Sequence, residues 1–428
     1  MTNTTDQRTA RARRRPARTK KAWIAAALSA VLVLGGCAAT GSADGAPAAT
    51  TSSTADAAAP ASTREETVTG TAAAAQAFME TLSDEQREQL LYAYDDESKT
   101  TTWSNFPVTF VDRAGLDLDD LTGKQRAAAM EVLEALLSEE GYETVTGIMG
   151  GDEFLLENSS STEDSLGRYY IAFFGDPSDT GAWQVQFGGH HLGLNATLDG
   201  SDDSVTFAPT HLGSQPAVYT NEEGEEVQPL AGMYETAFAF YDSLTEEQKA
   251  DLYQGSEVRN LTCAPGGTCS YPTGTGLAGA DLTDEQKQLL LDVVANWVGL
   301  ADEETTAAAL AEIEATLDET YVNWSGATEY DMSRGDGIYF QISGPDVYVE
   351  FADQQGSAGA DVDGYTTSGW GHIHTVYRDP ANDYAGSVTQ QEATGMGGPG
   401  EGDPGEGGPG TGEPPSGAPG DGAPGDEG

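Results

Sequence analysis

The chain has few basic residues and few cysteines for its length. Its 428 residues include 20 Lys and Arg against 70 Asp and Glu, a formal net charge of −50, and 3 Cys. Phosphate binding needs Lys and Arg to displace counterions, so this balance excludes a nucleic-acid partner and favours cationic partners. An acidic surface is also typical of adaptation to an extracellular or salt-exposed environment.

Several motifs that carry known chemistry are absent as well. The sequence has no Cys-x-x-Cys pair, no Gly-x-Ser-x-Gly and no Gly-rich loop that follows a strand. Its Asp pairs lack the full spacing of a calcium-binding loop. Cys263 and Cys269 instead enclose a short loop, which suits a disulfide in an oxidising compartment.

The first 36 residues have the pattern of a secretory signal peptide. Basic residues crowd positions 8–21, and the apolar run at 22–34 is too short to cross a bilayer as a helix. Cys37 directly follows Leu-Gly-Gly, which predicts a lipoprotein signal with Cys37 lipidated as the mature N-terminus. The protein is then anchored to the extracytoplasmic face of the cell membrane. The alternative is an ordinary signal peptide cut beside an incidental Cys.

Composition divides the remaining chain into a tether, a folded part and a tail. Residues 37–67 are rich in Ala, Ser and Thr, which predicts a flexible tether. Residues 387–428 form an acidic Gly- and Pro-rich tail with too few apolar residues to bury a core. The folded part is long for one domain, so we expect two halves, residues 68–230 and residues 231–386.

One six-residue phrase occurs four times in the folded part. Each copy has Ser or Thr followed three residues later by Gln, the capping box that begins a helix. The copies begin at Leu82, Leu121, Leu244 and Leu282. The starts at 82 and 244, and those at 121 and 282, are both separated by about 160 residues, which indicates an internal duplication.

Strand-like runs follow the helices in the same order in each half. They lie at residues 169–174 and 183–187 in the first half, and at 338–342 and 347–351 in the second. We therefore predict an α+β fold of two related halves. Each half is a helix pair followed by mainly antiparallel strands, and the halves pack as one pseudo-symmetric body.

Four of the five His residues occur as two short clusters at corresponding places in the halves. His190-His191 follows the strand at 183–187, and His372-Ile-His374 follows the matching strand of the second half. Alternate residues of a strand share a face, so His372 and His374 can chelate one transition-metal ion. A pseudo-twofold axis would add His190 or His191. The fourth position is then either filled by another side chain or open to water for metal-activated chemistry.

Further polar residues near the clusters are candidates to complete this site. We consider Gln186, Glu350 and Asp379 as additional ligands, and Arg378 as a group that orients an anion or a ligating carboxylate. The alternative is that the His pairs are buried hydrogen-bond hubs between sheets. His211 stands alone in the sequence, and we expect it to be a surface or hydrogen-bonded His.

Longer motifs resemble a bacterial family catalogued as domain of unknown function 3500. The resemblance covers roughly residues 72–386 and implies no reaction, cofactor or catalytic residue. It rests on Trp103-Ser-Asn-Phe-Pro107, Gly141-Tyr-Glu-Thr-Val-Thr-Gly147, Gln186-Phe-Gly-Gly-His-His-Leu192 and His372-Ile-His-Thr-Val-Tyr-Arg-Asp-Pro-Ala-Asn-Asp-Tyr384.

Three functions fit these observations. The first is a metal-dependent extracytoplasmic protein, in one form an enzyme acting on small molecules or envelope material. The second is a non-catalytic lipoprotein that captures a ligand between its halves, which an aromatic cleft lined by Trp103, Trp183 and Trp370 would favour. The third is a structural surface protein. The metal hypothesis ranks first because it uses both His clusters.

Overall fold

The computed structural model describes residues 63–161, 166–255, 260–266, 269–357 and 359–389. The predicted signal peptide, the lipid attachment, nearly all of the tether and most of the tail lie outside these residues. Within the described part of the chain, no helix combines the length and the apolar character needed to cross a membrane.

Eight α-helices are present in the described residues, and four of them begin at the repeated phrase. They are α1 (Arg64–Glu80), α2 (Asp84–Leu90), α3 (Gly123–Leu136), α4 (Glu139–Asn158), α5 (Ala231–Ser243), α6 (Glu246–Leu252), α7 (Asp284–Val298) and α8 (Glu303–Ala315). The capping boxes predicted from the sequence are confirmed at the starts of α2, α3, α6 and α7. In each one the Ser or Thr hydroxyl accepts a hydrogen bond from the backbone N–H of the Gln. The Gln side chain in turn accepts a hydrogen bond from the backbone N–H of the Ser or Thr.

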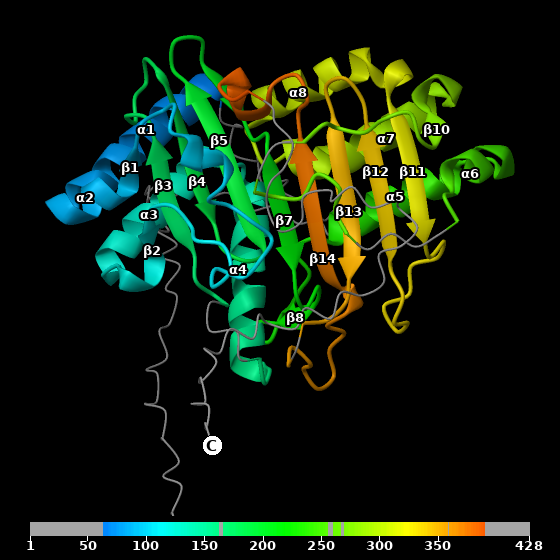
Figure 1. Cartoon of the computed structure of the whole chain (residues 1–428), viewed down its shortest axis with the longest axis horizontal. Helices are drawn as coiled ribbons and strands as arrows, with labels where there is room; N and C mark the ends of the chain where they lie inside the picture. The colour runs from blue at the N-terminus through cyan, green and yellow to red at the C-terminus, as the bar shows by residue number, and fades with distance from the viewer. Residues whose placement is uncertain (1–62, 162–165, 256–259, 267–268, 358, 390–428) are drawn as a thin grey trace, which may run out of the picture. The chain divides into compact units, whose positions relative to one another are not determined.

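Strands between and after the helices build one large sheet and one separate pair (Figure 1). They are β1 (Leu91–Tyr92), β2 (Leu116–Asp117), β3 (Tyr170–Phe174), β4 (Ala182–Gly188), β5 (Leu192–Asp199), β6 (Ser204–Thr206), β7 (Thr210–Ser214), β8 (Tyr219–Thr220), β9 (Glu226–Val227), β10 (Leu277–Ala278), β11 (Tyr321–Gly326), β12 (Ile338–Ser343), β13 (Tyr348–Gln354) and β14 (Gly369–Arg378). The four predicted strand runs are confirmed as β3, β4, β12 and β13.

In the part of the chain that the structure describes, the sheet has twelve strands and is mostly antiparallel. Its main path runs β1-β3-β4-β5-β7-β14-β13-β12-β11-β10, with β2 on β3 and β6 on β5, while β8 and β9 form a separate pair. The predicted α+β class is therefore confirmed. In the middle of the path β7 and β14 pair antiparallel, from Thr210 opposite Tyr377 to Ser214 opposite Ile373. This β7–β14 seam joins the strands that precede α5 to those that follow it.

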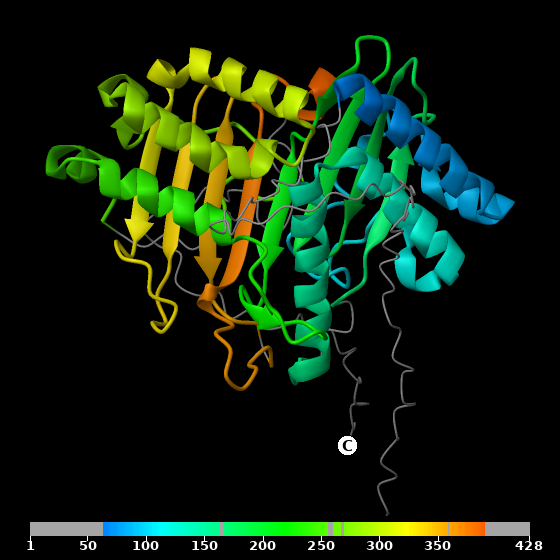
Figure 2. The same ribbon diagram turned by 180° about the vertical axis from the view of Figure 1, so that it is seen from behind.

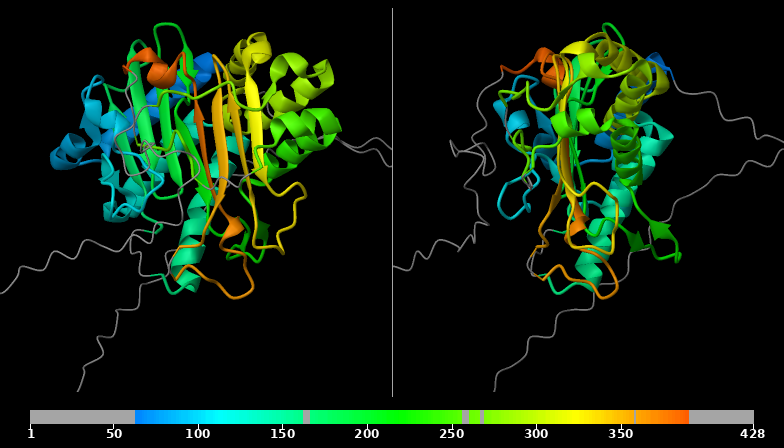
Figure 3. Two further views of the ribbon diagram at one scale, coloured as in Figure 1. Left: turned by 45° about the vertical axis from the view of Figure 1, so that its right-hand side comes forward. Right: turned by 90° about the vertical axis from the view of Figure 1, so that its right-hand side faces the viewer.

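Helices cover one face of the sheet, as the views from behind and from the edge show (Figures 2 and 3). One continuous apolar core lies between them, built from buried side chains of α1, α3, α4, α5 and α7 and of strands on both sides of the seam. Phe173 of β3 and Phe340 of β12 belong to it. Burial of apolar surface on this scale is the main driving force that holds the helices against the sheet.

Candidate metal centre

All five His residues of the chain lie in one buried cluster at the seam. His190 and His191 occupy the turn between β4 and β5, His211 lies on β7, and His372 and His374 lie on β14. Their exposed fractions range from 0% to 7%. The ring centroid of His191 is 4.2 Å from that of His190 and 5.2 Å from that of His374. The two predicted clusters therefore meet in space.

Of the two alternatives expected for His211, a surface or a hydrogen-bonded ring, the structure shows the hydrogen-bonded one. It is not at the surface, because its exposed fraction is 0%, and its ring centroid lies 5.2 Å from that of His374. Its Nδ1 lies 2.7 Å from the carbonyl oxygen of Thr375, which fixes the ring beside the seam. The register of β7 against β14, which sequence spacing does not reveal, brings it here.

A glycine in β7 makes room for the cluster. Gly213 pairs with His374 across the seam, and its N–H donates to the carbonyl oxygen of His191 at 2.7 Å. A Cβ atom at this position would lie 2.7 Å from the carbonyl oxygen of Ile373 and 3.3 Å from Cδ2 of His191. The absence of a side chain therefore lets the β4–β5 turn approach β14 across β7.

Three of the five rings form a candidate ligand set. One nitrogen from each of His190, His191 and His374 lies within 4.8 Å of the other two. Nδ1 of His190, Nε2 of His191 and Nδ1 of His374 are buried and have no hydrogen-bond partner. Nε2 of His211 is a fourth such nitrogen, but His211 does not belong to the set of three. Since most buried polar atoms are hydrogen-bonded, three such nitrogens in one place require an explanation. A bound metal ion would supply their missing partner.

The hydrogen bonds of His372 assign a tautomer to His374. Nδ1 of His372 lies 2.6 Å from the carbonyl oxygen of Gln355, so it must carry a proton and donate. Nε2 of a neutral His372 then accepts, and its partner at 3.0 Å is Nε2 of His374. His374 thus donates from Nε2 and keeps a free lone pair on Nδ1. His372 itself lies beside the triad, with both ring nitrogens already engaged.

A buried carboxylate assigns the tautomer of His191 in the same way. Nδ1 of His191 donates to Oδ1 of Asp152 on α4, and Tyr169 donates from its hydroxyl to Oδ2 at 2.7 Å. The lone pair of His191 is therefore on Nε2, the nitrogen without a partner. A carboxylate behind a metal-binding His is the usual arrangement that fixes ring orientation and raises ligand basicity.

Burial keeps the whole cluster uncharged. It lowers the pKa of His191 and of His372 to about 3 and that of His211 to about 4. The pKa values of His190 and His374 are also lowered well below the ordinary value, first by burial and then by neighbouring His residues. Neutral imidazole is the form that binds metal, so the site needs no deprotonation at neutral pH.

The other predicted site residues have partners elsewhere. Gln186 donates to the carbonyl oxygen of Lys99 and to Asn195, and Asp379 accepts from the backbone of the turn that follows it. Arg378 forms a buried ion pair with Asp383, with Nη1 and Oδ2 3.1 Å apart. Their hydrogen bonds are thus made outside the His triad.

Trp103, Trp183 and Trp370 do not form the aromatic cleft that would favour the ligand-capture alternative. Trp103, Trp183 and Trp370 have exposed fractions of 1%, 0% and 0%, so they are packed inside the protein and do not line an open surface. Trp183 and Trp370 belong to the main core. A hollow of about 440 Å³ lies elsewhere, around Tyr253 and Arg334, and none of its lining residues is a His.

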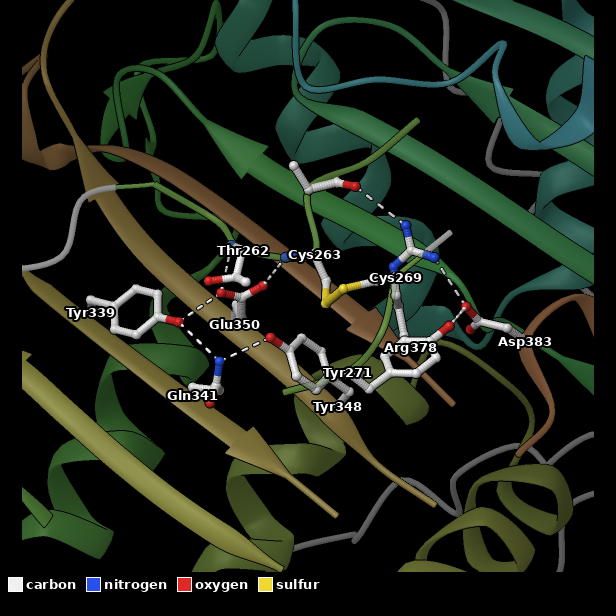
Figure 4. The surroundings of a disulfide bond; sticks show 11 residues. Thr262, Cys263, Cys269, Tyr271, Tyr339, Gln341, Tyr348, Glu350, Arg378 and Asp383 are labelled. Atoms are coloured by element: carbon white, nitrogen blue, oxygen red, sulfur yellow. Dashed lines mark hydrogen bonds and ion pairs between the residues drawn. A yellow bond between two sulfur atoms is a disulfide. The ribbon is translucent and has the colours of Figure 1, made fainter. Parts of the chain in front are cut away.

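Glu350 anchors the disulfide loop (Figure 4). Cys263 and Cys269 are joined by a disulfide, and the backbone N–H groups of Thr262 and Cys263 each donate to the Glu350 carboxylate at 2.7 Å. The hydroxyl of Tyr339 adds a third hydrogen bond at 2.6 Å. Although burial raises the pKa of Glu350, these donors oppose the shift. The carboxylate therefore holds the loop against β13.

Replacing Glu350 with Ala should destabilise the protein strongly. Three donors, two of them in buried and one in a partly buried hydrogen bond, would lose their acceptor, which predicts a fall in the free energy of unfolding of about 3 kcal/mol. Glu350→Gln keeps the side-chain volume and one acceptor oxygen, so the free energy of unfolding should fall less in this variant. Denaturant unfolding of the oxidised protein measures both. A loss below roughly 1 kcal/mol for Glu350→Ala would contradict the anchoring role.

Residues 64–386 match one family model, described as a protein of unknown function (DUF3500). The chain belongs to this family. The match confirms the family that the motifs indicated, and all five His residues lie within the DUF3500 region. No curated protein and no solved structure gives a match.

Sequence reasoning missed two residues of this buried cluster, Asp152 and His211. Asp152 had a detectable signal, because it occurs at helical spacing among the buried Val145, Ile148 and Leu155 of α4. An acidic residue on an apolar helix face needs a buried partner. His211 has no such signal in the sequence.

Proposed function

We propose that this protein is an exported bacterial lipoprotein that binds one divalent transition-metal ion through His190, His191 and His374. The observation that carries the metal proposal is the set of three buried ring nitrogens without partners, two of which have lone pairs assigned by hydrogen bonds of their own rings. Export and lipid attachment at Cys37 are supported by the sequence pattern of the first 37 residues.

The donor set favours a borderline metal ion. Three neutral imidazoles suit Zn²⁺, Cu²⁺, Ni²⁺ or Co²⁺, whereas Mg²⁺ and Ca²⁺ prefer oxygen ligands. Asp152 is the nearest acid by hydrogen bonding, and it is engaged with His191 and Tyr169. Burial raises the pKa of Asp152 to about 6, against the attraction of His190 and the Tyr169 hydrogen bond.

Three protein ligands leave a fourth position on a tetrahedral ion. Water there would be activated by the metal, which is the basis of an enzymatic role in hydrolysis or oxygen chemistry. A structural role is the second candidate. It is favoured by the low exposure of the triad, at most 7%, and by ligands that come from both sides of the β7–β14 seam.

The proposal includes the internal duplication, with the metal binding between its two halves. One contact supports it in particular. The capping Gln86 and Gln125 of α2 and α3 hydrogen-bond to each other at 2.9 Å, and Gln248 and Gln286 of α6 and α7 do the same at 2.9 Å. Equivalent contacts between equivalent helix starts are expected if each half descends from one ancestral unit.

Metal content tests the proposed function directly. The protein, purified without chelator and without a poly-His tag, should hold about one transition-metal ion per chain, as a three-His site predicts. Elemental mass spectrometry measures this, before and after exposure to Zn²⁺, Cu²⁺, Fe²⁺ and Mn²⁺. A variant with Ala at His190, His191 and His374 is the control. Absence of bound metal from the wild type after every reloading would refute the proposal.

A further inference from the structure

His211 has one ring nitrogen in use and one without a partner. Its Nδ1 lies 2.7 Å from the carbonyl oxygen of Thr375, so Nδ1 carries the proton of the neutral ring and donates it. Nε2 is then an acceptor, and it is buried without a hydrogen-bond partner. Because the exposed fraction of His211 is 0%, this lone pair faces the protein interior and calls for a donor there.

The free edge of the His211 ring faces the turn between β4 and β5. Burial lowers the pKa of His211 to about 4, while the backbone carbonyls of Thr375 and His190 act in the opposite direction. Thr375 occupies the Nδ1 edge, so the His190 carbonyl lies on the Nε2 side. It forms no hydrogen bond with Nε2, because a carbonyl oxygen and an imidazole lone pair are both acceptors. The ring therefore reaches from β14 towards the turn that carries His190 and His191.

His211 is next to the triad but outside it. Its ring centroid lies 5.2 Å from that of His374. Burial lowers the pKa of each triad residue first, and the proximity of His211 lowers it further, so His211 lies near all three. It does not belong to the set of nitrogens that all lie within 4.8 Å of one another. A nitrogen in this position is too far from the triad to complete it as a ligand, but near enough to contact something bound to the same ion.

One ligand atom between the ion and His211 fits this spacing. An oxygen bound to the ion at about 2 Å can donate a hydrogen bond to Nε2 across about 2.8 Å, which places the ring about 4 Å or more from the ion. Three His ligands leave a fourth position on a tetrahedral ion for such an oxygen. The same hydrogen bond would supply the donor that Nε2 lacks.

We infer that His211 holds the ligand at the fourth position of the metal through a hydrogen bond to Nε2, and thereby selects ligands that carry a proton. The inference rests on the proposed metal function. Water and hydroxide qualify, because each can bind the ion through oxygen and donate an O–H to Nε2. An anion without a proton, such as azide, places a lone pair against that of Nε2. His211 acts on the ligand and not on the ion, so its loss should leave metal binding in place.

Cobalt is the probe, because the visible absorption of bound Co²⁺ changes when one of its ligands is exchanged. The full-length protein, loaded with Co²⁺, is titrated with ammonia and with azide at one mildly alkaline pH. Ammonia is a neutral ligand with N–H donors, whereas azide has none. Wild type and His211→Asn are compared, since the amide group of Asn can stand in for Nδ1 but has no counterpart of Nε2.

The ratio of ammonia affinity to azide affinity should fall about 10-fold or more in His211→Asn, which corresponds to about 1.4 kcal/mol. Ammonia loses its acceptor in this variant, and azide loses an unfavourable neighbour. A change that only loosens the site would shift both affinities in the same direction and leave their ratio unchanged. The ratio therefore separates ligand selection by His211 from a merely structural role.

Thr210→Val is the matched control, because Thr210 is the neighbouring residue on β7, is also fully buried and donates from its hydroxyl to the carbonyl oxygen of Phe207. Its ratio should equal that of the wild type. An unchanged ratio in His211→Asn, or one that Thr210→Val reproduces, would overturn the role of His211 and leave the metal function intact. Loss of the Co²⁺ ion from His211→Asn would make His211 a ligand and overturn the inference as well. A wild type that takes up no Co²⁺ would overturn both.

Discussion

Replacing His374 with Ala is expected to remove metal binding, whereas replacing His372 with Ala is expected only to weaken it. Nδ1 of His374 has a lone pair and no partner, so its loss removes a ligand. The affinity should fall on the order of 1000-fold, given the binding free energies typical of structural zinc sites. Towards the triad, His372 makes only one contact, in which it accepts a hydrogen bond from His374. Residues that support a metal ligand in this way typically contribute roughly 10- to 100-fold to the metal affinity.

Competition titration with a chromophoric chelator, together with metal content, measures both variants. His211→Ala is the matched control, since it also removes a buried imidazole but belongs outside the triad. It should keep about one ion per chain, as the wild type does, if the three-His set is complete. Equal losses for His372→Ala and His374→Ala would instead make both residues ligands and refute the assigned tautomers.

Acidification of the metal-free protein from pH 7 to pH 5 is expected to cost several kcal/mol of unfolding free energy. His191, His211 and His372 have folded-state pKa values of about 3 to about 4, well below the ordinary value of 6.5. In the unfolded chain they take up protons near pH 6.5, while in the folded protein they stay neutral. Stability from these groups is therefore complete above pH 6.5 and is lost as the pH falls.

The size of this loss follows from the pKa differences. One pKa unit corresponds to about 1.4 kcal/mol, and pH 5 lies about 1.5 units below the ordinary His pKa. Each of these three His residues therefore lowers the free energy of unfolding by about 2 kcal/mol at pH 5. Asp152 acts in the opposite direction, because its pKa is raised to about 6 and the folded state gains a proton there first. Its contribution at pH 5 is on the order of 1 kcal/mol, which offsets only part of the loss.

Denaturant unfolding at several pH values, with metal removed, measures this dependence. Bound Zn²⁺ should oppose the loss, because protons must displace the metal before the His residues can be charged. A free energy of unfolding that stays constant between pH 7 and pH 5 would show that the His residues titrate near their ordinary pKa in the folded protein, as hydrated imidazoles do, and would contradict the expectation.

Much of the fold could be predicted because its signals are local. The capping boxes at Ser83, Thr122, Thr245 and Thr283 each depend on a residue and another three positions later, so a short window contains the whole interaction. The strand runs likewise follow from alternation and β-branched or aromatic content. Recurrence of the His pairs after matching strands gave reason to expect a shared cluster, and four of its five rings were named from the sequence.

By itself, the sequence determined the starts of α2, α3, α6 and α7, the strands β3, β4, β12 and β13, the α+β class, the family and the residue types available for metal binding. Only the tertiary structure decided which rings combine. The pairing of β7 with β14 brings His211 beside His374, and Gly213 lets the His191 turn approach both. The lone pairs depend on Asp152 and Gln355, whose contacts with the rings are long-range or lie outside any sequence repeat. The register of the strands and the tautomers of the His rings depend on residues that are distant in the sequence and adjacent in space. A pattern of neighbouring residues in the sequence does not reveal these contacts.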